Sequence, residues 1–86
     1  MTYLIEWLPA AARQLRRLDK PVQKRLALAV ARLGADPRPP GVKALVGRPG
    51  ALRLRVGDWR VVNEVQDGRL IVLVIAVGHR REVYDR

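Results

Sequence analysis

Apolar and polar residues alternate along two neighbouring runs between residues 52 and 62, and Gly57-Asp58 separates the runs. This period of two predicts two half-buried strands, and a Gly-Asp pair between such runs is typical of a two-residue hairpin turn. Successive side chains of a strand point to opposite faces of the sheet. The core face is expected to hold Leu52, Leu54, Trp59 and Val61, and the other face Arg53, Arg55 and Arg60. Because Arg55 and Arg60 would repel each other across the hairpin, an anion bound there would explain the arrangement.

The residues before this hairpin predict one strand and two helices. Residues 3–7 are rich in aromatic and β-branched residues, as strands are. Pro9 suits the first turn of a helix that continues to Leu18 through good helix formers. Asp19 is expected to cap a second helix, in which apolar residues recur at helical spacing until Gly34. The two helices form a predicted hairpin whose apolar stripe needs a sheet to pack against.

The remaining residues predict a loop and further strands. The proline-rich residues 36–41 form a loop, and residues 42–50 are expected to continue irregularly. Asp67-Gly68 predicts a second tight turn, after which residues 69–77 return antiparallel to the preceding strand. A last short strand is expected at residues 82–84. The order β-α-α-β-β-β(-β) predicts a single α+β domain over residues 1–86, with an antiparallel sheet of four or more strands and the helical hairpin on one face.

The amino-acid composition restricts the classes of function that this chain can have. The chain has 17 Lys and Arg against 8 acidic residues, a formal charge of +9, which indicates nucleic acid or another acidic partner. The absence of Cys excludes disulfides and thiolate metal sites, and a single His argues against a transition-metal centre. The N-terminus does not read as a signal peptide, and the longest apolar run is far too short to cross a bilayer. We therefore expect a cytoplasmic protein that uses no membrane, metal or cofactor.

Several candidate site residues are expected to converge at one end of the sheet. With Asp67-Gly68 as the turn, Arg60 lies opposite Ile75, and the segment after Val77 emerges beside the arginines. The expected basic corner consists of Arg55, Arg60, His79, Arg80 and Arg81, with Tyr84 within reach. Arginines bind phosphate and offset charge in a transition state, and a histidine carries protons near neutral pH. Each side chain alone also fits an ordinary surface or packing role, but together they suit phosphodiester chemistry.

Several stretches of the chain resemble toxins of the RelE/ParE superfamily, on the RelE side. They are the strand ending in Trp7 with Pro9-Ala10, and residues 15–20, 37–45, 52–62 and 77–84. The last two stretches are specific in combination, although neither would decide the matter alone.

The resemblance implies a metal-free, ribosome-dependent endoribonuclease that cuts mRNA in the ribosomal A site. The ribose 2′-hydroxyl would attack its own 3′ phosphodiester and leave a 2′,3′-cyclic phosphate and a 5′-hydroxyl. The family's basic catalytic residues would correspond to Arg53, Arg55, Arg60 and Arg80, its C-terminal aromatic residue to Tyr84, and an acid–base residue of some relatives to His79. The resemblance also implies a RelB-like antitoxin, encoded next to the toxin, whose extended segment covers the basic site.

We assign catalysis to Arg55, Arg60, His79, Arg80 and Tyr84, and RNA binding to Arg53, Arg81, Lys43 and Arg48. RelE-type toxins often have Lys where this chain has Arg53 and Arg55. Arginine, with a pKa above about 12, is a poor proton acceptor, so either His79 carries the proton or the mechanism is mainly electrostatic. Asn63 stands at a core-face position where relatives commonly have Tyr.

Two other functions remain open. A ParE-like toxin would share the fold but act on DNA gyrase without the catalytic cluster. A non-catalytic nucleic-acid-binding module would use the same cations only to position phosphates.

Overall fold

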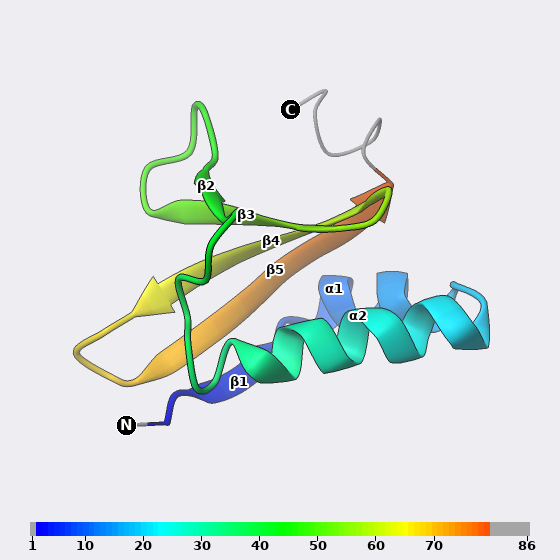
Figure 1. Ribbon diagram of the computed structural model, residues 1–86, viewed down its shortest axis with the longest axis horizontal. Coiled ribbons are helices and arrows are strands. Elements are labelled where there is room, and N and C mark those ends of the chain that lie inside the picture. The colour runs from blue at the N-terminus through cyan, green and yellow to red at the C-terminus, as the bar shows by residue number, and fades with distance from the viewer. Residues whose placement is uncertain (1, 80–86) are drawn as a thin grey trace.

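A computed structural model describes residues 2–79, which form a five-stranded sheet with two helices along one face (Figure 1). In chain order the elements are β1 (Leu4–Trp7), α1 (Pro9–Arg16), α2 (Lys20–Arg32), β2 (Lys43–Ala44), β3 (Ala51–Val56), β4 (Trp59–Gln66) and β5 (Ile71–His79). This is the α+β fold expected from the sequence, with β2 as a short strand where irregular chain was expected. The strand expected at residues 82–84 lies outside the described residues.

The sheet is mixed, and in this respect the expectation of an antiparallel sheet is wrong. The strand order is β1-β5-β4-β3-β2, and β1 runs parallel to β5 with Leu4 opposite Ile71 and Trp7 opposite Val74. The other neighbouring strands are antiparallel. Turn signals in a sequence fix the direction only of strands that follow each other directly. No such turn links β1 to β5, so turn signals could not predict the direction of this pair.

A glutamine side chain links the two helices of the hairpin by hydrogen bonds. Gln23 Nε2 of α2 donates a hydrogen bond to the Leu18 carbonyl at 2.6 Å and a longer one to the Arg16 carbonyl at 3.4 Å. These bonds serve carbonyl groups at the C-terminal end of α1, which have no partner within the helix. Asp19 occupies the N-cap position of α2 as expected, but its side chain makes no capping hydrogen bond.

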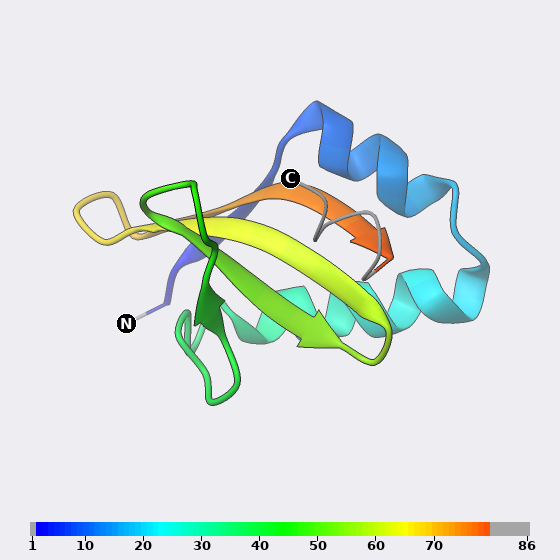
Figure 2. The ribbon, with the colours of Figure 1, turned by 90° about the horizontal axis from the view of Figure 1, so that it is seen from above.

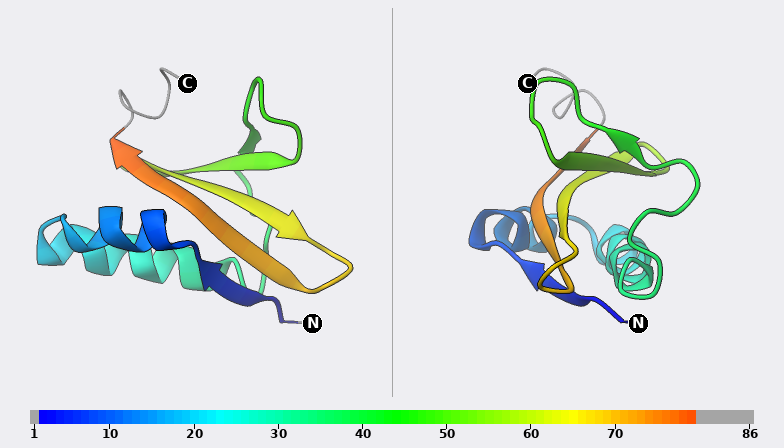
Figure 3. Two further views of the ribbon diagram at one scale, coloured as in Figure 1. Left: turned by 180° about the vertical axis from the view of Figure 1, so that it is seen from behind. Right: turned by 90° about the vertical axis from the view of Figure 1, so that its left-hand side faces the viewer.

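The core lies between the helices and the sheet, as Figure 3 shows from two sides. Its buried members are Ala11, Leu26, Val30, Val61, Val74 and Val77, and Leu54 and Trp59 pack against them. The prediction that Leu54, Trp59 and Val61 face the core is therefore confirmed. A smaller apolar cluster consists of Ala51 and Val62, with Leu45, Ile75 and Ala76 packed against them.

The β4–β5 hairpin has a different register from the predicted one. Its turn covers four residues, 67–70, so that Gln66 pairs with Ile71, and Leu70 has a positive φ of 55°. A bulge between Val62 and Asn63 adds one further residue on β5. Arg60 therefore lies opposite Gly78, whereas the predicted two-residue turn placed it opposite Ile75.

Candidate functional site

Three arginines of the β3–β4 hairpin share one face of the sheet, as predicted. Arg55 lies directly opposite Arg60, and Arg53 lies opposite Val62. Their hairpin neighbours Leu54 and Val61 point to the core, so these arginines occupy the face that the helices leave uncovered (Figure 3). We call the surface formed by Arg53, Arg55 and Arg60 the arginine face.

The β3–β4 turn orients two of these side chains. Arg55 Nε donates to the Gly57 carbonyl at 3.2 Å, and Arg60 Nη1 donates to the same carbonyl at 3.4 Å and to the Trp59 carbonyl at 3.2 Å. Arg60 is only 4% exposed, although it carries a charge. Its strand partner Gly78 has no side chain, so β5 places no side chain opposite Arg60 on this face. A fixed, closely spaced pair of guanidinium groups is suited to gripping one anion.

His79 lies on the other side of the sheet. It pairs with Trp59, and the two rings meet edge to face with centroids 5.5 Å apart. Because Trp59 packs against the helix-side core, His79 also lies on the helix side rather than on the arginine face. The expected convergence of His79 with Arg55 and Arg60 is therefore not found. The predicted site residues Arg80, Arg81 and Tyr84 lie outside the described residues.

The RNA-binding candidates on β2 and the following loop extend the arginine face. Lys43 is exposed and pairs with Arg53, which places both side chains on the same face. Arg48 is exposed in the loop between β2 and β3, which rises on the side of the sheet away from the helices (Figure 1). Cations from β2, the β2–β3 loop, β3 and β4 thus lie on the side of the sheet away from the helices, where they could contact a phosphate backbone.

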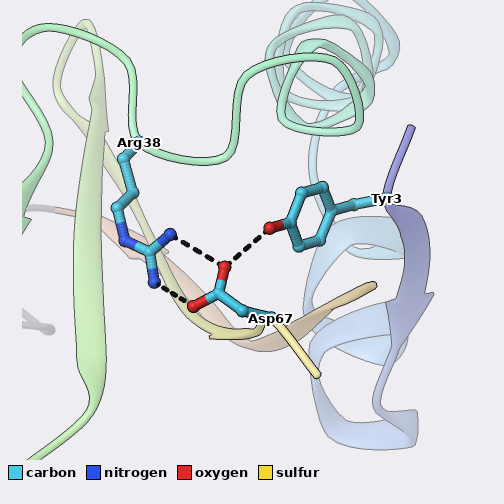
Figure 4. Close-up of polar contacts among 3 residues, drawn as sticks. All are labelled: Tyr3, Arg38 and Asp67. Carbon is cyan, nitrogen blue, oxygen red and sulfur yellow. Dashed lines mark hydrogen bonds and ion pairs between the residues drawn. The ribbon is translucent and has the colours of Figure 1, made fainter. Parts of the chain in front are cut away.

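A second polar cluster, which the sequence analysis did not identify, lies at the far end of the sheet (Figure 4). Tyr3 Oη donates to Asp67 Oδ1 at 2.6 Å, and Arg38 Nη1 and Nη2 donate to the two oxygens of Asp67 at 3.1 and 2.9 Å. The pKa of Asp67 is lowered from 3.8 to about 2, mainly by the hydrogen bonds from Arg38 and to a smaller extent by the one from Tyr3. The bond to Asp67 raises the pKa of Tyr3. The cluster therefore links three segments that are far apart in the sequence, namely the start of the chain, the proline-rich loop and the β4–β5 turn.

The described part of the chain contains neither a membrane-spanning helix nor a metal-binding group of side chains. Neither α1 nor α2 is long and apolar enough to cross a membrane. Within residues 2–79, no three His, Asp or Glu side chains are grouped so that they could hold a metal ion.

A family model described as "ParE toxin of type II toxin-antitoxin system, parDE" matches residues 5–84. The chain belongs to this toxin family. Its predicted place in the RelE/ParE superfamily is thereby confirmed.

Individual relatives point to the RelE branch. The toxin is 32% identical to a protein of Escherichia coli named as RelE-like toxin, over 99% of this chain and 93% of the relative. Among solved structures, a double arginine-to-alanine variant of the E. coli toxin RelE in the free state matches with a TM-score of 0.81 and 28% identity, covering 99% of this chain and 93% of that one. RelE in the intact E. coli RelBE toxin-antitoxin complex matches with a TM-score of 0.78 and 25% identity, covering 90% of this chain and 95% of that one.

Proposed function

We propose that this toxin is an endoribonuclease that cleaves mRNA on the ribosome and needs no metal. The observation that carries the proposal is the Arg55–Arg60 pair, which a single carbonyl orients on the face of the sheet away from the helices. The similarity to RelE toxins supports the same assignment. A surface that only needed charge for solubility would have no reason to place two guanidinium groups directly opposite each other.

In the proposed reaction, the ribose 2′-hydroxyl attacks the adjacent phosphorus while the bond to the 5′ oxygen breaks. The 2′-hydroxyl loses its proton and the departing 5′ oxygen gains one, leaving a 2′,3′-cyclic phosphate and a 5′-hydroxyl. Arg55 and Arg60 contact the phosphate oxygens and offset the charge that grows on them. Arg80 and Tyr84, which the resemblance assigns to the site, complete the proposed catalytic set.

The position of His79 bears on how the proton moves. The sequence left two mechanisms open, one with His79 as the proton carrier and one that is mainly electrostatic. Because His79 contacts Trp59 on the helix side, the imidazole is separated from the arginine pair by the sheet. We therefore favour the electrostatic mechanism, in which the arginines stabilise the transition state and His79 packs against Trp59.

The row of Lys43, Arg53 and Arg48, with Arg81, is proposed to position the mRNA. Contacts to phosphates fix the register of a strand without reading its sequence. Loss of any one of these cations should weaken binding in a salt-dependent way and leave the chemical step nearly intact.

A RelB-like antitoxin, encoded next to the toxin, is the proposed protein partner. The solved RelBE complex of E. coli supports such a partner for a RelE-like toxin. Beside its cations, the arginine face carries Leu45, Ile75 and Ala76, which are partly exposed and pack against the buried Ala51 and Val62. An extended segment with acidic and apolar side chains could pair with the cations and cover the apolar residues at once.

The decisive experiment is primer extension on mRNA with purified toxin, with and without ribosomes. We expect cleavage on ribosomes and none on free mRNA, and loss of cleavage in Arg55→Ala/Arg60→Ala. The ParE name of the matching family favours one alternative, inhibition of DNA gyrase, so a supercoiling assay belongs beside it. Inhibited supercoiling without cleavage would replace the nuclease proposal, and RNA binding without either activity would indicate a non-catalytic module.

A further inference from the structure

Arg25 reaches from the helical layer to the turn that orients the arginine pair. A Cβ atom built on Gly57 would lie 3.0 Å from Arg25 Nη2 and 3.7 Å from both its Cζ and Nη1. The guanidinium group of Arg25 therefore packs against Gly57. Figure 2, seen from above, shows the β3–β4 turn over the first half of α2, in agreement with this contact.

Three guanidinium groups consequently surround one glycine. Arg55 and Arg60 donate to the Gly57 carbonyl from the sheet, and Arg25 contacts the same residue from α2. Arg25 is exposed and, within residues 2–79, makes no side-chain hydrogen bond or ion pair. Asp58 is the acidic residue of this turn, and one carboxylate does not balance three cations. Like charges gathered this closely favour a bound anion.

We propose that Arg25 and the β3–β4 turn form a second phosphate subsite, which binds an RNA phosphodiester next to the one held by Arg55 and Arg60. This inference rests on the proposed function, because it takes the strand on the arginine face to be RNA. A strand that leaves the arginine pair at the β3–β4 turn meets Arg25 directly, since Gly57 contacts all three guanidinium groups. The bound strand would then pass around the end of the hairpin toward the helical layer.

The subsite also explains the residue at position 57. Gly57 has a φ of +63°, which glycine adopts readily and other residues rarely do. A Cβ at this position would in addition lie 3.0 Å from Arg25 Nη2, so the guanidinium group of Arg25 would have to shift by a few tenths of an ångström. Gly57 therefore serves both the turn and the approach of Arg25.

The test compares Arg25→Gln and Arg25→Lys with Arg32→Gln as a matched control. Arg32 is an exposed arginine two helical turns further along α2. The two readouts are cleavage kinetics on programmed ribosomes and the salt dependence of binding to a single-stranded RNA oligonucleotide. We expect Arg25→Gln to raise KM about tenfold with kcat nearly unchanged. The slope of log affinity against log salt should fall by about 0.7, the value for one lost phosphate contact on a single strand. Arg25→Lys should retain part of the RNA binding that Arg25 contributes, and Arg32→Gln should behave as wild type.

A double variant separates a positioned subsite from general charge loss. Gly57→Ala should shift the guanidinium group of Arg25 and reproduce part of the KM increase, and Arg25→Gln/Gly57→Ala should be less than additive. An unchanged KM and salt slope in Arg25→Gln would overturn the subsite even if the toxin cleaves mRNA. Weaker binding of an acidic peptide with unchanged RNA binding would also overturn it, in favour of a protein contact. Arg25-dependent RNA binding in a toxin that does not cleave would keep the subsite and refute the nuclease.

Discussion

Arg55 and Arg60 lie directly opposite each other on β3 and β4, and both donate a hydrogen bond to the carbonyl of Gly57. Two cations are thus held in place before any ligand arrives. Groups that are positioned in advance need no reorganisation when charge develops, which is the condition for strong electrostatic stabilisation of a transition state.

Replacement of Arg60 by Ala should reduce the rate of cleavage by about 10²–10³, because one fixed charged donor is lost. Arg60→Lys should recover only part of the rate, since Lys keeps the charge but loses the planar fork. The measurement is single-turnover cleavage of programmed ribosomes. Arg69→Ala, in the exposed turn at the other end of β4, is the control and should keep full activity. Because Arg60 is nearly buried, thermal melting of each variant must accompany the kinetics, and a folded Arg60→Ala with full activity would refute the proposed role.

Replacement of His79 by Gln should leave the pH profile of cleavage unchanged near neutral pH. The reason is that His79 contacts Trp59 on the helix side and not the arginine pair. Loss of this edge-to-face contact should instead lower stability by about 0.5–1.5 kcal/mol, which a denaturant titration can measure. The opposite outcome would be a wild-type cleavage rate that changes between about pH 6 and 8 and a His79→Gln rate that does not. That result would restore His79 as the proton carrier.

Asp67→Asn should remove a component of acid stability. The pKa of Asp67 is lowered to about 2 in the folded protein from its ordinary 3.8. The ionised carboxylate therefore favours folding above the ordinary pKa, and this contribution is lost as pH falls toward 2. The melting temperatures of wild type and Asp67→Asn should differ most above pH 4 and converge toward pH 2. Asp36→Asn, an exposed carboxylate of the nearby loop, is the control and should show no such convergence.

Asn63→Leu should stabilise the fold. Asn63 is fully buried on the core side, and neither its Nδ2 nor its Oδ1 has a hydrogen-bond partner within residues 2–79. An unsatisfied buried polar group costs about 1–3 kcal/mol, and an apolar side chain of similar size avoids that cost. The melting temperature should rise by about 4–8 °C for each kcal/mol gained. Asn63→Ala, which removes the amide but leaves unfilled space, should gain less. A lower melting temperature for Asn63→Leu would show that the amide is paired in solution.

The β3–β4 hairpin could be predicted in full because its signals are local. The alternation along both strands and the Gly57-Asp58 turn fix the pairing of Arg55 with Arg60, and with it the arginine face. The position of Arg25 could not be predicted, because helical periodicity shows only that its side chain avoids the core. Its contact with Gly57 depends on how the helix lies across the end of the hairpin.

His79 was predicted to converge with the arginines, and its different position can be traced to single residues. The longer β4–β5 turn shifts the register by two residues, which leaves every side chain on its predicted face. The bulge opposite Val62 and Asn63 adds one more residue, and a shift by one residue moves the following side chains to the other face. Neither the bulge nor the positive φ of Leu70 has a clear signal in the sequence.

The place of β5 between β1 and β4 constrains when this toxin can become harmful during its own synthesis. Leu4–Trp7 leave the ribosome before the other strands of the sheet, yet their partners Ile71–Val74 belong to the last strand of the described fold to appear. Until then the arginine hairpin lacks the strand on its inner side, and a two-stranded hairpin is marginally stable in water. The nascent chain therefore carries its cations without the rigid surface that aims them, and it acquires that surface only after β5 has been made.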